Sequence, residues 1–133
     1  MAKCIFCDIV HSNDSSKIIF EDDDVVVFPD IKPAAPHHYL VVPKEHIKDA
    51  KSLKSEFKTL VQKMVDTGNR ILQEKEANLH DSRLGFHWPP FNSISHLHLH
   101  VIAPQSEMNL ISRAIFKQDS WWFVSPEYVI SRL

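Results

Sequence analysis

Hydrophobic and polar residues alternate along several short segments of this chain, and a period of two predicts half-buried β-strands. Other segments are short runs of β-branched and aromatic residues, which also favour strands. Together these patterns predict strands at residues 17–20, 25–28, 38–42, 82–86 and 95–103. The acidic residues 21–24 predict a hairpin turn between the first two strands, and the proline-rich segment 31–36 predicts a rigid loop.

Apolar residues at steps of three and four predict one long helix over residues 53–76. Ser52 is its expected N-cap, and Gly68 lies on the apolar stripe, where it predicts close packing of the helix on the sheet. A weaker pattern indicates a helix at 106–116, and Ser125-Pro126 predicts the start of another. The stripe consists of Leu53, Phe57, Leu60, Val61, Met64, Val65, Ile71 and Leu72.

These elements predict an α+β fold: an antiparallel sheet of about five strands, one long helix and short terminal helices. A length of 133 residues predicts a single domain over 1–133. The 44% of hydrophobic and 24% of charged residues are ordinary for a globular protein. Because no apolar run approaches membrane-spanning length, we expect no membrane partner.

Charge and composition narrow the range of expected partners, cofactors and cellular locations. A formal net charge of -2 gives no general basic field, so a nucleic-acid partner is not expected. The only glycines are Gly68 and Gly85, which excludes a Gly-rich phosphate loop, and we expect no organic cofactor. The N-terminus lacks the pattern of a secretory signal, and Cys4 and Cys7 have the spacing of a metal or redox pair. We therefore expect a cytoplasmic protein that, being small, also enters the nucleus.

The segment from His96 to Ile102 carries the clearest chemical signal. His96, His98 and His100 should project from one face of a strand, while Leu97 and Leu99 enter the core on the other. Imidazole exchanges its proton near pH 7, so it can act as nucleophile, general acid or base, or metal ligand. Satisfied surface histidines and a pure metal site are the competing interpretations.

His-x-His-x-His followed by two apolar residues resembles the signature of the histidine triad family of nucleotide hydrolases and transferases, and the segment from Phe28 to Ile47 is similar to that family's first half. The resemblance covers residues 4–104, with 105–133 as a branch-specific extension, and is strongest to the Hint branch. It implies the fold predicted above and a two-fold homodimer in which two sheets join.

The resemblance implies a purine nucleotide substrate: adenosine phosphoramidates are cleaved to AMP and an amine. His98 takes the role of nucleophile, and a backbone carbonyl should hold its other nitrogen. His100 and His38 match positions that donate to phosphate oxygens, whereas His37 should face the opposite side of its strand. The alternatives are removal of AMP from nucleic-acid ends, as in a neighbouring branch, and a nucleotide-binding interaction module with residual activity.

The resemblance also implies a binding site around the nucleotide. Asp30 matches the carboxylate that accepts hydrogen bonds from ribose, and Asn92 and Ser93 match polar residues near the phosphate and leaving group, where Ser93 could pass a proton to the amine. His87 stands where other branches carry asparagine, so we expect loop 87–91 and Trp121-Trp122 to influence the choice of leaving group. The apolar cleft around the base would comprise Ile5, Phe6, Ile9, Phe28 and Ile31.

A structural zinc site is the last expectation. Related proteins with this Cys-x-x-Cys, a Pro-Lys-x-His segment and the triad bind zinc, which implies Cys4, Cys7, His46 and His96 as ligands. Two thiolates and two imidazoles are a common tetrahedral set for structural zinc. The alternative is a pair of reduced thiols without metal near a disordered terminus.

Overall fold

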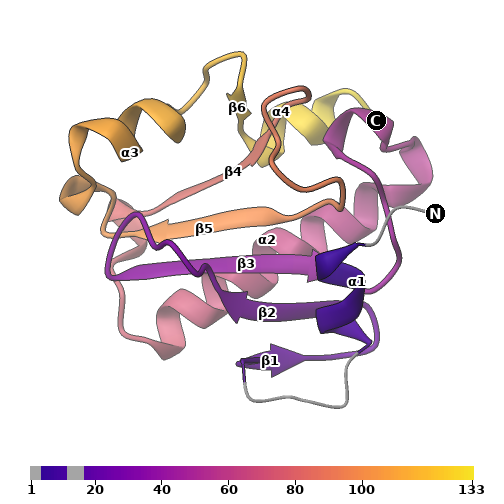
Figure 1. The fold of residues 1–133 in the computed structure, drawn as a ribbon, viewed down its shortest axis with the longest axis horizontal. Coiled ribbons are helices and arrows are strands. Elements are labelled where there is room, and N and C mark those ends of the chain that lie inside the picture. Colours follow the sequence, from indigo (N-terminus) through magenta and orange to yellow (C-terminus); the bar gives the residue numbers. More distant parts are fainter. Residues whose placement is uncertain (1–3, 12–16) are drawn as a thin grey trace.

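Six strands form the centre of the computed structural model, which describes residues 4–11 and 17–133. They are β1 (Phe20–Glu21), β2 (Val25–Pro29), β3 (His37–Pro43), β4 (Arg83–His87), β5 (Leu99–Ala103) and β6 (Phe123–Val124). The strands pair antiparallel in the order β1-β2-β3-β5-β4-β6 (Figure 1). The chain therefore folds into one sheet whose long central strands, β3 and β5, come from its two halves.

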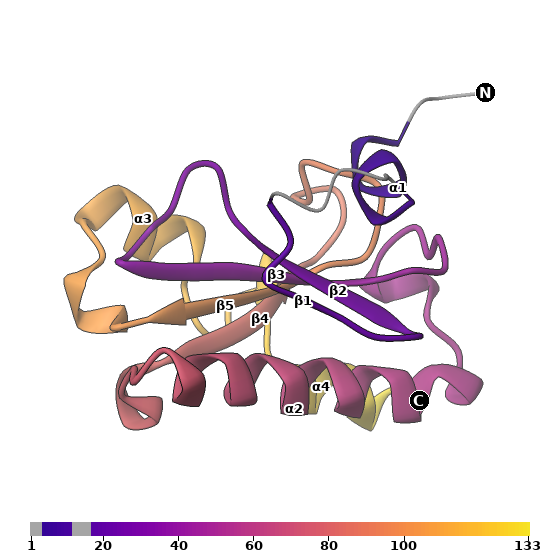
Figure 2. The ribbon, with the colours of Figure 1, turned by 90° about the horizontal axis from the view of Figure 1, so that it is seen from below.

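Helices cover both faces of this sheet. They are α1 (Ile5–Val10), α2 (Lys58–Glu74), α3 (Leu110–Ile115) and α4 (Pro126–Ser131). Seen along the edge of the sheet, α2 and α4 lie on one side, while α1 and α3 lie on the other (Figure 2). The α+β class is thus confirmed, with the long helix alone covering most of one face.

The main hydrophobic core lies between α2 and the sheet. Val61, Met64 and Leu72 of α2 are fully buried there, as are Leu99 and Val101 of β5. Gly68 permits this contact, because a Cβ at this position would lie 2.7 Å from the Val101 Cγ2 atom. The close packing predicted for Gly68 is confirmed.

Two smaller apolar clusters occupy the opposite face of the sheet. Phe6 and Val10 of α1 pack on Phe28 and Leu40, and Phe116 packs with Ile102 under α3. His38 of β3 and His100 of β5 lie on this face, because directly paired and alternate positions of neighbouring strands share a face. The two clusters thereby form apolar walls on either side of the histidine row.

The main differences from the sequence prediction concern the long helix, the triad strand and the number of strands. The long helix begins at Lys58 rather than 53, because Leu53 is extended backbone and Ser52 ends a 3₁₀ turn (Ala50–Ser52) capped by Asp49. Ser52 is therefore not the helix N-cap. The strand predicted at 95–103 begins at Leu99, since the His96 carbonyl accepts a hydrogen bond from the His98 ring. The sheet has six strands instead of about five, because β6 adds a two-residue edge.

The segment after residue 104 completes the sheet and the core. Phe123 pairs with His87, and Val124 pairs with Phe86, which places β6 along the end of β4. Gly85 makes room for this edge, because a Cβ there would lie 2.6 Å from the Phe123 ring and 2.8 Å from the Val124 carbonyl oxygen. Among the described helices, none combines the length and apolar character needed to cross a membrane.

Candidate active site

Alternation along the triad segment separates the histidine side chains from the core side chains, as expected. Leu97, Leu99 and Val101 are buried in the main core under α2. His98 lies just before β5 and His100 within it, and both rings are buried on the opposite face. The extended backbone keeps its two-residue period across the start of the strand, so the predicted facing of the histidines survives the shorter strand.

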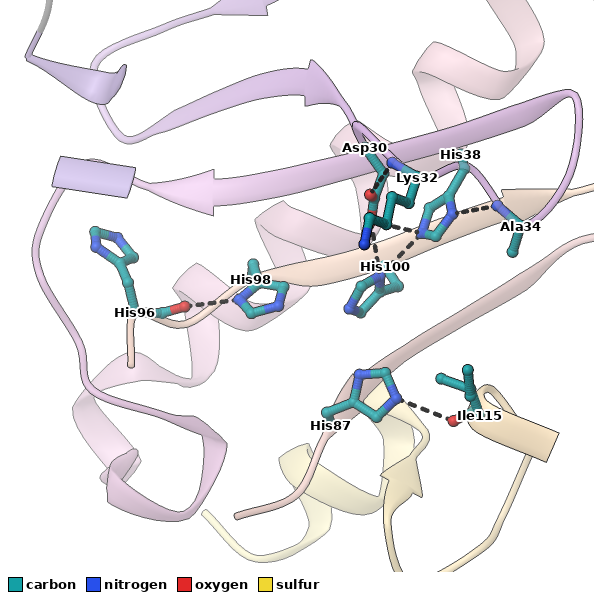
Figure 3. Close-up of polar contacts among 9 residues, drawn as sticks. All are labelled: Asp30, Lys32, Ala34, His38, His87, His96, His98, His100 and Ile115. Atoms are coloured by element: carbon teal, nitrogen blue, oxygen red, sulfur yellow. Dashed lines mark hydrogen bonds and ion pairs between the residues drawn. The ribbon is translucent and has the colours of Figure 1, made fainter. Parts of the chain in front are cut away.

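The β3–β5 register brings a third buried histidine to this row. His38 pairs with Ile102 and Leu40 pairs with His100, so His38 and His100 are diagonal neighbours on one face. Their Nε2 and Nδ1 atoms lie 2.9 Å apart (Figure 3). His37 faces the other side, where its Nδ1 lies 2.9 Å from the Tyr39 hydroxyl.

Backbone contacts fix the protons of the His38–His100 pair. The Ala34 N–H donates to His38 Nδ1 at 2.9 Å, so the proton of a neutral His38 is on Nε2. His38 Nε2–H can then donate to His100 Nδ1, which leaves the proton of neutral His100 on its own Nε2. This Nε2 is buried and, within the described chain, has no hydrogen-bond partner. It is a donor prepared for a bound acceptor.

His98 has the complementary arrangement. Its Nδ1–H donates to the His96 carbonyl at 2.7 Å, as expected for a ring held by the backbone (Figure 3). The lone pair of neutral His98 is therefore on Nε2, the atom that could attack an electrophile. The Phe6 ring packs edge-on against the imidazole, with centroids 5.0 Å apart, and shields one side from water.

Burial makes these imidazoles neutral. It lowers the pKa of His38 and of His98 to about 4 each, and it lowers the pKa of His100 well below its ordinary value. The Asp30 carboxylate opposes this effect at His38, but burial is the larger influence. At neutral pH the site therefore offers a nucleophilic lone pair on His98 beside a neutral N–H donor on His100.

Asp30 and His87 complete the polar group. The Asp30 Oδ2 atom lies 3.4 Å from His38 Nε2 and 4.0 Å from His100 Nδ1, while Oδ1 accepts the Lys32 N–H at 2.9 Å. His87 ends β4, and its Nε2–H donates to the Ile115 carbonyl at 3.0 Å (Figure 3). The His87 ring lies 5.0 Å from that of His100, so His87 adds a fourth imidazole to those of His38, His98 and His100.

The other expected binding residues are less closely grouped. Phe6 and Phe28 are buried and in edge contact, with ring centroids 5.4 Å apart, and Ile9 is half-buried. Ile5 and Ile31, by contrast, are 60% and 85% exposed. Asn92 is half-buried and lines a narrow cavity that His87 and His98 also line, while Ser93 is exposed on the same loop.

The two tryptophans near the C-terminus lie in different environments. Trp122 lines a pocket of about 380 Å³ next to His87, together with Phe91, Ala114 and Ile115. Trp121 is 80% exposed and lines a separate groove of about 410 Å³ with Trp88 and Tyr128. Only Trp122 thus shares a pocket with a residue of the histidine cluster, which divides the single segment expected from the sequence.

Sequence reasoning missed Phe116. This residue ends α3, and its ring lies 5.2 Å from that of His38, 5.0 Å from that of His100 and 5.1 Å from that of His87. It forms the apolar wall that keeps water from these imidazoles. No periodic pattern marks it, because it follows a six-residue helix and is brought to the site by the path of the chain after β5.

A second cluster joins α1 to the triad segment. The donor atoms of Cys4, Cys7, His46 and His96 all lie within 4.8 Å of one another. Nδ1 of His96 is 3.4 Å from Cys4 Sγ and 3.5 Å from Cys7 Sγ, and Nδ1 of His46 is 3.2 Å from Cys7 Sγ. A tetrahedral zinc ion would separate sulfur and nitrogen ligands by about 3.6 Å. His96 Nε2–H donates to the Pro43 carbonyl, which leaves Nδ1 free to bind a metal. The cluster could therefore hold a metal such as zinc.

Comparison with known proteins identifies the relatives of this chain. The family model described as "Scavenger mRNA decapping enzyme C-term binding" matches residues 3–116. The chain is 46% identical over 132 residues to adenosine 5'-monophosphoramidase HINT3 of Xenopus tropicalis, covering 98% of this chain and 86% of the relative. It is 48% identical over 102 residues to the bifunctional adenosine 5'-phosphosulfate phosphorylase/adenylylsulfatase HINT4 of Arabidopsis thaliana, covering 75% and 69%.

More distant similarities agree on the fold. Aprataxin of Danio rerio is 34% identical over 122 residues, which are 86% of this chain but 36% of that protein. The crystal structure of a HIT family hydrolase from Legionella pneumophila superimposes with a TM-score of 0.71 at 27% identity, covering 76% of this chain and 92% of that one.

Proposed function

Because the chain belongs to the histidine triad family, we propose that it is an adenosine 5'-monophosphoramidase, which hydrolyses the P–N bond of an adenosine phosphoramidate to AMP and an amine. The observation that carries this proposal is that two neighbouring imidazoles differ in the protonation of Nε2. His98 keeps a lone pair on Nε2, while His100 carries an unpartnered proton on Nε2. A nucleophile next to a donor is what attack on a phosphoryl group requires.

The first step forms a nucleotidyl-histidine. His98 Nε2 attacks the α-phosphorus, and the P–N bond breaks with its electron pair going to the amine nitrogen. The leaving amine takes the hydroxyl proton of Ser93, and Ser93 regains a proton from a solvent water molecule. His100 Nε2–H donates to a non-bridging oxygen, whose charge grows as the new bond forms. Because the imidazoles are neutral at pH 7, the attacking nitrogen needs no prior deprotonation.

Water completes the reaction in a second step. It attacks the same phosphorus, the bond between phosphorus and His98 Nε2 breaks, and the water molecule releases a proton to solvent. AMP leaves, and the imidazole returns to its neutral form. Throughout, Asp30 would accept hydrogen bonds from the ribose, and Asn92 would contact the phosphate. Phe6, Phe28, Ile5, Ile9 and Ile31 would surround the base, with Ile5 and Ile31 becoming covered only when a nucleotide binds.

The proposal is tested by hydrolysis of AMP-NH2 with matched histidine variants. We expect His98→Ala to lose at least about 10³-fold in kcat, because it removes the covalent step. His37→Ala changes a residue on the opposite face of the sheet and should keep near wild-type kcat. Mass spectrometry of wild type quenched during turnover should detect an AMP adduct on His98. A folded His98→Ala variant with near wild-type kcat would contradict the nucleophile assignment.

A substrate panel separates the alternatives. Aprataxin-like deadenylation is supported by the aprataxin similarity but not by the net charge of -2. Comparing kcat/KM for AMP-NH2, AMP-lysine, adenosine 5'-phosphosulfate and adenylated DNA decides among these activities. Fastest turnover of the DNA would favour deadenylation, and no turnover of any substrate together with AMP binding would favour an interaction module.

We further propose that Cys4, Cys7, His46 and His96 bind one structural zinc ion per chain. When bound, this ion would crosslink α1 to the triad segment and so hold Phe6 against His98. Metal analysis of protein purified without chelator should give about one equivalent of zinc, and Cys7→Ser should reduce it and lower Tm. Less than about a tenth of an equivalent in the wild type would refute the site.

We also propose a homodimer, which the family membership supports. The homodimer is tested by analytical ultracentrifugation of the purified chain over a range of concentrations. A single monomeric species would contradict it. We propose a cytoplasmic location with entry to the nucleus, which microscopy of the labelled protein in cells would test.

A further inference from the structure

The start of β4 and the end of β5 lie near α3 at one end of the sheet (Figure 1). Residues from this end of the sheet line a basic pocket. Its volume is about 520 Å³, and three cations line it: Arg83, Arg113 and Lys117. The only carboxylate in its lining is Asp81. This concentration of positive charge contrasts with the formal net charge of -2 of the whole chain.

The cations of this pocket are not neutralised by the protein. Asp81 points at Ser106, accepting the Ser106 N–H at 3.2 Å and its hydroxyl at 2.5 Å. Within the ranges 4–11 and 17–133, no carboxylate forms an ion pair with Arg83, Arg113 or Lys117. Clustered cations without an anionic partner favour an anionic ligand.

Neutral contacts hold the two arginines in place. Arg83 donates from Nε to the Gln105 side-chain oxygen at 3.1 Å and from Nη1 to the Phe116 carbonyl at 2.8 Å. Arg113 donates from Nη2 to the Ser106 carbonyl at 2.8 Å. Each guanidinium has five N–H donors, so these contacts position the groups and leave further donors for a ligand. Burial and the neighbouring Arg113 charge lower the pKa of Arg83, as two close, unneutralised cations require.

We propose that this basic pocket, lined by Arg83, Arg113 and Lys117, binds a phosphate-type oxyanion. Planar guanidinium groups match the tetrahedral oxygens of phosphate with paired N–H donors, and Lys117 adds a mobile point charge. The group bound is the phosphate itself, supplied either as a free anion or as part of a nucleotide. This binding site is separate from the phosphate position at His98 and His100, and its occupancy does not depend on the proposed hydrolysis.

The pocket shares a wall with the histidine cluster. Arg83, Ile102 and His38 are paired residues on three adjacent strands, so all three lie on one face of the sheet. Phe116 packs against His38 and offers its carbonyl to Arg83, which places it between the two sites. Arg83 and His38 are therefore separated by about two strand spacings, roughly 10 Å, along the same face of the sheet.

The test uses the full chain and inorganic pyrophosphate as the first probe. The Nε–H signals of Arg83 and Arg113 in ¹⁵N-edited NMR spectra should shift saturably as pyrophosphate is added. Arg113→Gln/Lys117→Gln should weaken this binding about tenfold or more, since it removes two charge-assisted contacts. Arg83 is left intact because it also holds Phe116. The matched control is Lys51→Gln/Lys54→Gln, two exposed residues outside the pocket, which should bind as wild type does.

A second titration with ATP distinguishes the sources of the phosphate. Arginine shifts with pyrophosphate support a site for free anions, and shifts with ATP alone support a site for a phosphate carried on a nucleotide. Arginine signals that move with neither probe, or equal affinities in the two double variants, would overturn the proposal. Hydrolysis of AMP-NH2 is measured separately, so failure of this site and failure of the proposed phosphoramidase are distinguishable.

Discussion

Single backbone contacts decide the roles of the histidines in this site. His98 gives its Nδ1 proton to the His96 carbonyl, and His96 gives its Nε2 proton to the Pro43 carbonyl. His38 instead receives the Ala34 N–H on Nδ1 and passes its own proton toward His100. Identical side chains thus become the proposed nucleophile, a candidate metal ligand and a donor pair, according to which ring nitrogen the backbone holds.

At the residue scale, we expect the specificity for the leaving group to depend on one tryptophan. Trp122→Ala should change the ranking of kcat/KM among amine leaving groups by about tenfold, because Trp122 lines the pocket beside His87. Trp88→Ala and Trp121→Ala should leave that ranking unchanged, since both residues line the separate groove. Kinetics with a small, an aliphatic and an aromatic amine would measure this. A common factor for all amines in Trp122→Ala would contradict the specificity role.

Several site residues could be predicted from the sequence, and others could not. The two-residue period was enough to place His98 and His100 opposite Leu97 and Leu99, because an extended backbone fixes the facing of alternate residues. Phe116 was missed, since its place over His38 and His100 depends on the path of the chain between β5 and β6. Contacts made through the backbone of Ala34 and Pro43 likewise carry no side-chain signal.

Among the elements, boundaries were harder to predict than types. The apolar stripe identified the long helix correctly, but it extended through Leu53, which reaches the core from extended backbone before Lys58 begins α2. The two-residue strand β6 left no periodic pattern, because Phe123 and Val124 are too few to alternate. Helix α1 was also not predicted, since Ile5, Phe6 and Ile9 were interpreted only as cleft residues.

The contact between β4 and β6 should be sensitive to one added methyl group. Gly85→Ala would place Cβ 2.6 Å from the Phe123 ring and 2.8 Å from the Val124 carbonyl, so β6 would have to move. We expect the free energy of unfolding to fall by about 1–3 kcal/mol, measured by urea denaturation. Lys51→Ala, at an exposed position, is the control. A free energy of unfolding for Gly85→Ala within about 0.5 kcal/mol of wild type would show that β6 moves without loss of stability.

At the scale of the whole molecule, burial of neutral histidines makes stability depend on pH. Burial lowers the pKa of His38 to about 4, whereas the unfolded chain titrates near about 6.5. Between these values the unfolded state binds more protons than the folded state. The free energy of unfolding is therefore highest above about pH 6.5 and falls as the pH drops toward about 4. The loss is roughly 1.4 kcal/mol per pH unit for each such histidine.

This dependence can be assigned to His38 by comparing variants. Urea denaturation between about pH 7.5 and 5 should show a shallower loss of stability for His38→Gln than for wild type. His80→Gln, at an exposed position, should keep the wild-type slope. Both variants retain the Cys4–Cys7 cluster, so any metal contribution cancels between them. Equal slopes in all three proteins would argue against a buried, neutral His38.

The buried, unpartnered N–H of His100 also sets the thermodynamic state of the free protein. A buried donor without an acceptor costs about 1–3 kcal/mol, and the fold carries this cost until a phosphoryl oxygen or a water molecule accepts the proton. Folding and substrate recognition are therefore linked. A ligand that accepts the His100 hydrogen bond removes this cost and so binds more tightly, and the folded protein is more stable while the ligand is bound. Removing the imidazole would relieve the deficit, so the position is one where selection for stability and selection for catalysis oppose each other.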